Sequence, residues 1–139
     1  TEHHRQRRAP GLGLKSGPPT GVVSGNVAIV GDAAHAMAPN LGQGGGIAMQ
    51  NALSLATELS AVTDKSSVPA ALKRWEARER DLVEHTQTWS WVYSFLTTWP
   101  DDLRSAAMDI AAQTPWLLEQ RFRTAFSTPH GVERREAWS

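Results

Sequence analysis

The sequence contains no cysteine and has a formal net charge of zero, with 14 basic and 14 acidic residues. Because there is no cysteine, the chain can form no disulfide, and it cannot bind an iron–sulfur cluster or a zinc ion through thiolates. The balanced charge gives no general attraction to nucleic acid, so no nucleic-acid partner is expected. The sequence also lacks a run of about eighteen apolar residues, so no membrane span is expected. The lack of cysteine fits a cytoplasmic or organelle-stroma location, with any targeting region outside this chain.

Strands are also scarce. Only residues 26–31 form a convincing strand, and a single strand cannot make a parallel sheet. The chain begins at Thr1 and not at a methionine. We therefore expect a carboxy-terminal part of a longer protein, with the remainder of that parent chain as its partner.

The local composition divides the chain into four segments. The first is rich in glycine and proline, which resist both helix and strand, and the last is polar. We predict a flexible lead-in over residues 1–24, a strand, loop and helix over 25–63, further helices over 64–126, and a tail over 127–139.

Apolar residues that recur at every third and fourth position predict four helices. They cover residues 45–61, 68–98, 101–112 and 116–126. The predicted buried face of the first helix consists of Ala48, Ala52, Leu55, Ala56 and Leu59. In the second helix an apolar stripe runs from Val68 to Leu96, and Glu79 is placed with the charged residues on the opposite, solvent-facing side.

The ends of the second helix also have sequence signals. Ser67 is a suitable amino-terminal cap, and Pro69 is tolerated in the first turn. Trp99-Pro100 predicts the end of this helix, because the residue before a proline is pushed out of the helical conformation.

Six tryptophans are many for 139 residues. Exposed aromatic residues can stack on bases or ligands, and Trp89, Trp91 and Tyr93 lie close together in the sequence. Residues two apart on a helix face different ways, however, and no basic groove accompanies them. We therefore favour packing in a core or between domains over ligand stacking.

The rest of the chain is organised around residues 27–46. Four apolar residues end at Gly31-Asp32, and after Pro39 a glycine-rich loop, Gly42-Gln43-Gly44-Gly45-Gly46, leads into an apolar helix. An aspartate directly after a buried strand can bind a hydroxyl-bearing ligand or hold a structural turn, and these residues alone leave both interpretations open. Asp32 and His35 are too few ligands for a metal, so no metal site is predicted.

This stretch resembles the second flavin-binding motif of the FAD-dependent aromatic-ring hydroxylases, the monooxygenases of the para-hydroxybenzoate hydroxylase class. The resemblance covers residues 31–55 and rests on Gly31-Asp32-Ala33-Ala34-His35, Pro39 and Gly42-Gln43-Gly44, with Ala52 and Leu55 beyond. It implies an α/β, Rossmann-like FAD/NAD(P)-binding fold for the parent protein. The present chain would then be mostly α-helical, with one buried strand, and residues 25–63 would belong to the FAD-binding domain.

The resemblance also implies roles for individual residues. Asp32, with Gly31 before it, would accept hydrogen bonds from the ribityl chain of FAD. The segment from Pro39 would lie along the isoalloxazine ring, with backbone amides from Leu41 through Gly42, Gln43 and Gly44 to Gly45 facing its pyrimidine end. The amino terminus of a helix favours the negative charge that develops there on reduction.

No side chain of this segment is expected to act as a catalytic acid or base. Pro39 would shape the pocket on the substrate side, and His35 would have a structural role at the turn. Gly46 and Asn51 depart from the residues that are usual in the family at these positions.

The resemblance implies the carboxy-terminal part of a flavoprotein monooxygenase. Such an oxidoreductase inserts one oxygen atom of O₂ into a small organic substrate, using FAD and NAD(P)H. The amino-terminal GxGxxG fingerprint and the substrate-binding sheet of the family are not in this sequence, so we expect this chain alone to be inactive. The alternative is a non-catalytic helical module in which the same stretch is a turn and the tryptophan-bearing helices bind a partner.

Overall fold

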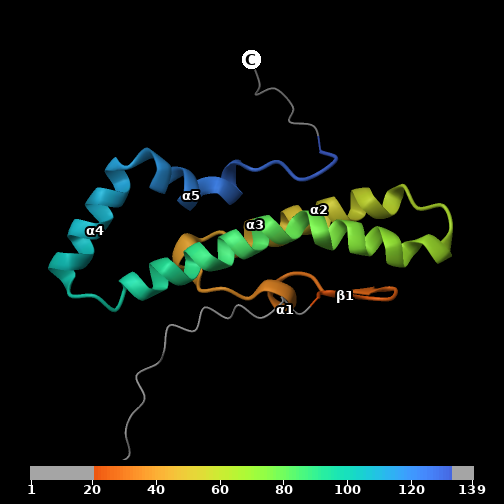
Figure 1. Ribbon diagram of the computed structural model, residues 1–139, viewed down its shortest axis with the longest axis horizontal. Helices are drawn as coiled ribbons and strands as arrows, with labels where there is room; N and C mark the ends of the chain where they lie inside the picture. The colour runs from red at the N-terminus through yellow and green to blue at the C-terminus, as the bar shows by residue number, and fades with distance from the viewer. Residues whose placement is uncertain (1–20, 133–139) are drawn as a thin grey trace, which may run out of the picture.

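The computed structural model describes residues 21–132, most of which are helical. A short β-hairpin is followed by the single-turn helix α1 (Asp32–His35) and the 3₁₀ helix η1 (Pro39–Leu41). The chain then forms α2 (Gly44–Ser60), a second 3₁₀ helix η2 (Lys65–Ser67) and α3 (Val68–Leu96), and it ends with α4 (Asp101–Gln113) and α5 (Pro115–Phe126). Figure 1 shows α2 and α3 as an antiparallel pair at the centre, with the hairpin on one side and α5 on the other.

The prediction of a buried strand over residues 26–31 is wrong for this structure. The described residues contain a two-stranded antiparallel hairpin, β1 (Val23–Ser24) with β2 (Val27–Ala28), joined by a turn at Gly25 and Asn26. The side chain of Val27 is 63% exposed, and those of Ile29 and Val30 are 45% and 43% exposed. These apolar residues stay exposed because no further strand covers them in the part of the chain that the structure describes.

The α2 helix begins and ends within one residue of its prediction, but it buries a different face. Ile47, Asn51 and Ser54 are buried, whereas Ala52 and Ala56 are exposed. The buried residues are spaced by four and three, which places them on one side of the helix. Because this side includes the polar residues Asn51 and Ser54, apolar periodicity pointed to the alanine positions as the buried face.

Glu79 is a second correction, because this carboxylate is buried and not on the solvent-facing side of α3. It lies seven positions after Leu72 and four after Trp75 on the same helix face, and both of these residues are buried. The Ser54 hydroxyl on α2 donates a hydrogen bond to Glu79 Oε1 at 2.5 Å, and Trp75 Nε1 donates to the Asn51 carbonyl oxygen at 3.1 Å. The interface between α2 and α3 therefore combines apolar packing with hydrogen bonds.

The ends of α3 lie close to their predicted positions. Pro69 lies in the first turn, as expected, and the last helical residue is Leu96. Ser67 precedes the helix, but its side chain makes no capping hydrogen bond, which corrects its predicted role. The side chain of Asp64 instead accepts a hydrogen bond from the Ser66 amide at 3.2 Å and caps η2.

The tryptophans divide between packing and exposure. Trp75 is buried, and Trp89 packs edge-to-face on Trp116 with ring centroids 5.9 Å apart. Trp91 and Trp99 are 44% and 37% exposed and flank Phe95 on the outer face of α3 and just beyond it. The packing prediction therefore holds for Trp75 and Trp89, whereas Trp91 and Trp99 are exposed in the part of the chain that the structure describes.

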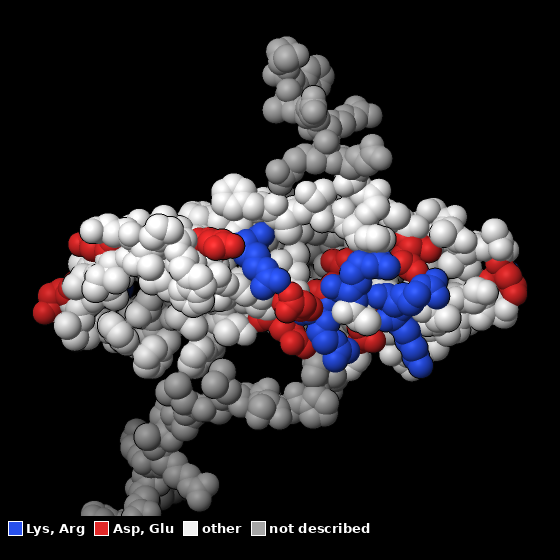
Figure 2. Space-filling view, turned by 45° about the horizontal axis from the view of Figure 1, so that its top comes forward, with Lys and Arg blue, Asp and Glu red and all other residues white. Residues whose placement is uncertain are grey.

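The charged side chains on the surface are mixed in sign. Figure 2 shows Lys and Arg side chains gathered beside Asp and Glu side chains on one face. Arg74 and Arg78 of α3 both form ion pairs with Glu58 of α2, at 2.8 and 3.0 Å. No helix in the described part of the chain combines the length and apolar character needed to cross a membrane.

Candidate functional site

The loop between α1 and α2 is held in place by side chains of α3 and by a backbone carbonyl of α5. On α3, Gln87 Nε2 donates to the Ala36 carbonyl oxygen at 3.3 Å, and the Ser90 hydroxyl donates to that of Ala38. Gln43 Nε2 at the end of the loop donates to the Arg121 carbonyl oxygen of α5 at 2.5 Å. Two of these contacts are made to backbone carbonyls of the loop, and the third is made by the side chain of Gln43.

Gly31 and Asp32 form the turn at the start of α1. Gly31 has a positive φ of 66°, a conformation that other residues rarely adopt, and a side chain there would meet nothing within 4 Å. Its carbonyl oxygen accepts hydrogen bonds from the amides of Ala34 and His35 at 2.9 and 3.0 Å. Asp32 is exposed, and its carboxylate has no hydrogen-bond partner or ion pair among the described residues. The turn therefore presents a free acceptor to solvent.

The glycine-rich segment forms the second turn. Pro39 and Leu41 lie in η1, and Gly42 ends it with a positive φ of 65° and an amide that donates to the Pro39 carbonyl oxygen at 2.9 Å. Gly44 and Gly45 are the first residues of α2, where amides have no carbonyl partner within their own helix. A Cβ at Gly45 would meet nothing within 4 Å, so the space beside this helix start is open.

The eight predicted contact residues therefore lie in two groups. Gly31 and Asp32 belong to the α1 turn, whereas the other six lie in one segment, residues 39–45, that runs through η1 into α2. Residues 36–38, which are tied to α3, separate the two groups. The roles of these residues toward a flavin remain predictions.

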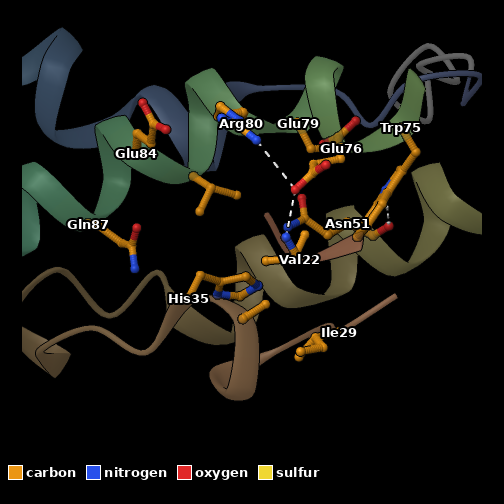
Figure 3. A pocket seen from close by; sticks show the side chains of 12 residues that line it. Val22, Ile29, His35, Asn51, Trp75, Glu76, Glu79, Arg80, Glu84 and Gln87 are labelled. Carbon is orange, nitrogen blue, oxygen red and sulfur yellow. Dashed lines mark hydrogen bonds and ion pairs between the residues drawn. The ribbon is translucent and has the colours of Figure 1, made fainter. Parts of the chain in front are cut away.

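A cavity of about 260 Å³ lies next to this site, between α1 and the α2–α3 pair. Figure 3 shows the His35 side chain extending from α1 into the space between α1 and α3. His35 is only 2% exposed, and both of its ring nitrogens lack a hydrogen-bond partner. None of the eight predicted contact residues lines this cavity.

The polar residues that line the cavity beside His35 were not predicted from the sequence as site residues. Asn51 was noted only as a departure from the family pattern, and Glu79 was placed on the wrong side of α3. The available signal was the spacing of polar residues within otherwise apolar faces, with Asn51 and Ser54 three apart and Trp75 and Glu79 four apart. That signal becomes specific only when the two helices are seen to face each other.

Comparison with known proteins assigns the family. The family described as FAD binding domain matches residues 15–90, which is more than half of the chain. The chain belongs to this family. The match includes the α1 turn, the glycine-rich loop and most of α3, and it implies an FAD/NAD(P)-binding fold. The family resemblance expected from residues 31–55 is thus confirmed.

Individual relatives agree with this assignment. The protein AqdB1 of Rhodococcus erythropolis is 43% identical over 109 residues, which are 78% of this chain and 28% of AqdB1. A 2-heptyl-3-hydroxy-4(1H)-quinolone synthase of Mycobacteroides abscessus is 44% identical over 80 residues, 58% of this chain and 20% of that protein. The FAD-dependent monooxygenase ntnJ of Nectria sp. is 37% identical over 86 residues, 61% of this chain and 20% of ntnJ.

The chain spans about a quarter or less of the length of these relatives. No solved structure matches it with statistical significance. The family assignment therefore rests on sequence, and the site geometry on the structure described above.

Proposed function

We propose that this chain is the part of an FAD-dependent monooxygenase that contacts the ribityl chain and the ring of FAD. The complete enzyme would use NAD(P)H and O₂ and would act on a small organic substrate. The single observation that carries this proposal is the free, exposed carboxylate of Asp32 on the α1 turn, within the region that matches the FAD binding domain. The family match favours this function over a non-catalytic helical module.

The exposed residues of the two turns suit a flavin. A ribityl chain carries several hydroxyl groups, each of which can donate a hydrogen bond to a carboxylate such as Asp32. The first amides of α2, at Gly44 and Gly45, have no partner within their helix and border open space. They can donate to an electron-rich edge of a ring, where the positive end of a helix dipole favours negative charge.

FAD, when bound, supplies the redox chemistry of the family. The residues of this chain then have binding and positioning roles. Asp32 holds the ribityl hydroxyls, the backbone from Leu41 to Gly45 orients the ring, and Pro39 shapes the wall on the substrate side without transferring a proton. The side chains of Gln87 and Ser90 keep this loop in register with α3.

We also propose that residues 27–30 become the buried strand of a larger sheet in the complete protein. Three of their side chains are apolar and at least 43% exposed in this structure. A two-stranded hairpin is only marginally stable in water, so additional strands would stabilise it. The relatives, which are several times longer, have enough chain to supply them.

The test is an Asp32→Ala substitution in a protein of the relatives' length, with FAD affinity measured by quenching of flavin fluorescence. Loss of hydrogen bonds to a charged acceptor should weaken binding about tenfold to a hundredfold. The matched control is Asp102→Ala, which removes an exposed carboxylate from α4, and its FAD affinity should equal that of the wild type. Wild-type affinity in the Asp32 variant would contradict the proposed role.

A further inference from the structure

The cavity between α1 and the α2–α3 pair has a second binding capacity that the flavin proposal does not use. Its apolar wall includes Ile29 and Val83, and its polar wall includes His35, Asn51 and Glu79. A volume of about 260 Å³ is enough for a small organic molecule in addition to water. The composition of the polar wall determines which chemistry fits.

Two buried side chains of this wall lack partners. His35 is 2% exposed with neither ring nitrogen hydrogen-bonded, and Asn51 is 3% exposed with no donor to its Oδ1. Buried polar groups are nearly always satisfied, so each of these atoms calls for a partner. Asn51 Oδ1 only accepts hydrogen bonds, and a neutral imidazole always has one accepting nitrogen.

Glu79 adds a charge to these acceptors. It is 8% exposed, its one hydrogen bond is the one from the Ser54 hydroxyl, and it forms no ion pair among the described residues. The neighbouring arginines have other carboxylate partners. Arg80, which lines the cavity together with Glu76 and Glu84, pairs with Glu76 at 3.3 Å, and Arg74 and Arg78 pair with Glu58. A buried carboxylate is normally accompanied by a cation, which this cavity has room to admit.

We propose that the cavity binds a small organic cation with a planar N–H donor group, an amidine or guanidine, next to a compact apolar body. The cation would donate to Asn51 Oδ1 and His35 and neutralise Glu79, while its apolar part lies against Ile29 and Val83. An anion is disfavoured by the same acceptors and by the wall's charge, because the carboxylates of Glu76, Glu79 and Glu84 outnumber the guanidinium of Arg80. A metal ion lacks ligands, since no three potential metal-binding side chains gather in the part of the chain that the structure describes.

Benzamidine is a suitable probe, and benzamide is its neutral counterpart of nearly the same shape. Each is titrated into the 139-residue protein while the ring resonances of His35 are followed by NMR. Benzamidine should shift these resonances in a saturable way, with an affinity about tenfold or more above that of benzamide, because a hydrogen bond to a charged group is the stronger one. Equal affinity for both probes, or unshifted His35 resonances, would overturn the proposal.

Two substitutions change the wall in opposite directions. Glu79→Gln removes the charge and should weaken benzamidine binding about tenfold, whereas Asn51→Asp adds a second carboxylate and should strengthen it by a similar factor. A gain of affinity cannot come from unfolding, so Asn51→Asp decides the matter even if the Glu79 variant is unstable. The control Glu119→Gln, on exposed α5 surface, should leave the affinity unchanged. Unchanged or weaker binding by Asn51→Asp would contradict the assignment.

Discussion

At the scale of single residues, the most informative feature is a polar group inside the helix interface. Glu79 is a carboxylate on a face where Leu72 and Trp75 are almost fully buried. Its burial is tolerated because the Ser54 hydroxyl donates a hydrogen bond to it across the interface. The pair therefore fixes how α2 and α3 face each other, since a rotation of either helix would break it.

This predicts a measurable cost for Ser54→Ala. The substitution leaves a buried carboxylate oxygen without its donor, so the free energy of unfolding in urea should fall by about 1–3 kcal/mol. The matched control is Ser60→Ala on the same helix, where the hydroxyl donates to the Thr57 carbonyl oxygen in an exposed position. It should change stability by no more than about 0.5 kcal/mol. Equal effects of the two substitutions would show that the Ser54–Glu79 contact is unimportant.

At the scale of elements, α2 and α3 are also joined at the surface by ion pairs. Glu58 on α2 accepts from Arg74 and Arg78 on α3, at 2.8 and 3.0 Å. Hydrogen bonding by Arg78, followed by Arg74 and their positive charges, lowers the pKa of Glu58, and these effects exceed the opposing desolvation. A carboxyl with a lowered pKa in the folded state stabilises that state when it is ionised.

The resulting pH dependence has a definite sign. The Glu58 contribution is fully present above the ordinary pKa of a glutamate and is lost as the pH falls through the lowered pKa of the folded state. We expect Glu58→Gln to destabilise the protein at neutral pH by about 0.2–1 kcal/mol, because the pairs are at the surface. The difference from wild type should vanish in acid and shrink in high salt.

Urea unfolding at several pH values measures this difference. Glu119→Gln serves as the control, because Glu119 is exposed and has no ion pair within the described residues. Its stability difference from wild type should stay near zero at every pH. A Glu58 effect that persists unchanged in acid would exclude an electrostatic cause.

The docking of α5 on α3 depends on a pair of buried threonines. The Thr86 hydroxyl donates to the Leu82 carbonyl oxygen at 2.7 Å, so its single proton is already in use. In the contact between the Thr86 and Thr124 hydroxyls, Thr124 is therefore the donor. Both side chains are at least 98% buried, with 1% and 2% exposure.

This arrangement predicts an unusual order of stabilities. Thr86→Val removes the acceptor of a buried hydroxyl and should cost about 1–3 kcal/mol, whereas replacing both threonines with valine removes the unsatisfied group as well and should cost less. Thermal unfolding of the two variants tests this order. A double variant less stable than Thr86→Val would mean that the hydroxyl pair is not the relevant contact.

At the scale of the whole molecule, large apolar side chains are exposed both before the α1 turn and on α3. Val27, Ile29 and Val30 are exposed beside the α1 turn, and Trp91 and Phe95 stack on the outer face of α3 with ring centroids 5.9 Å apart. Large exposed apolar patches usually mark an interface. We have proposed that further strands cover residues 27–30 in the complete protein.

Val27→Lys tests this proposal by comparing two lengths of chain. In the 139-residue protein Val27 is 63% exposed, so the substitution should change stability by no more than about 0.5 kcal/mol. In a protein of the relatives' length the lysine would be buried without a partner, which should greatly lower the yield of folded, flavin-containing protein. Thr88→Lys, at an exposed position on α3, controls for the added charge. Equal yields of the two long variants would contradict a buried strand.

Local sequence signals determined the positions of the helices. The apolar periodicity, Pro69 and Trp99-Pro100 placed α3 within two residues of its observed ends, and apolar periodicity placed α2 within one residue of its observed ends. The family was also readable from residues 31–55 alone, because the order of an acidic turn, a proline and a glycine-rich loop is specific. These features depend on neighbours in sequence, so the sequence was sufficient to predict them.

The tertiary structure decided which faces are buried and which residues meet. Hydrophobic periodicity predicted that the alanines of α2 are buried and that Glu79 faces solvent. The folded chain instead buries Ser54, Asn51 and Glu79. Their polar groups are tolerated only where a partner from another helix is within hydrogen-bond distance, as Ser54 is for Glu79. The exposure of residues 27–30 has the same origin, because burial of a strand depends on other strands that cover it, and its own sequence cannot supply them.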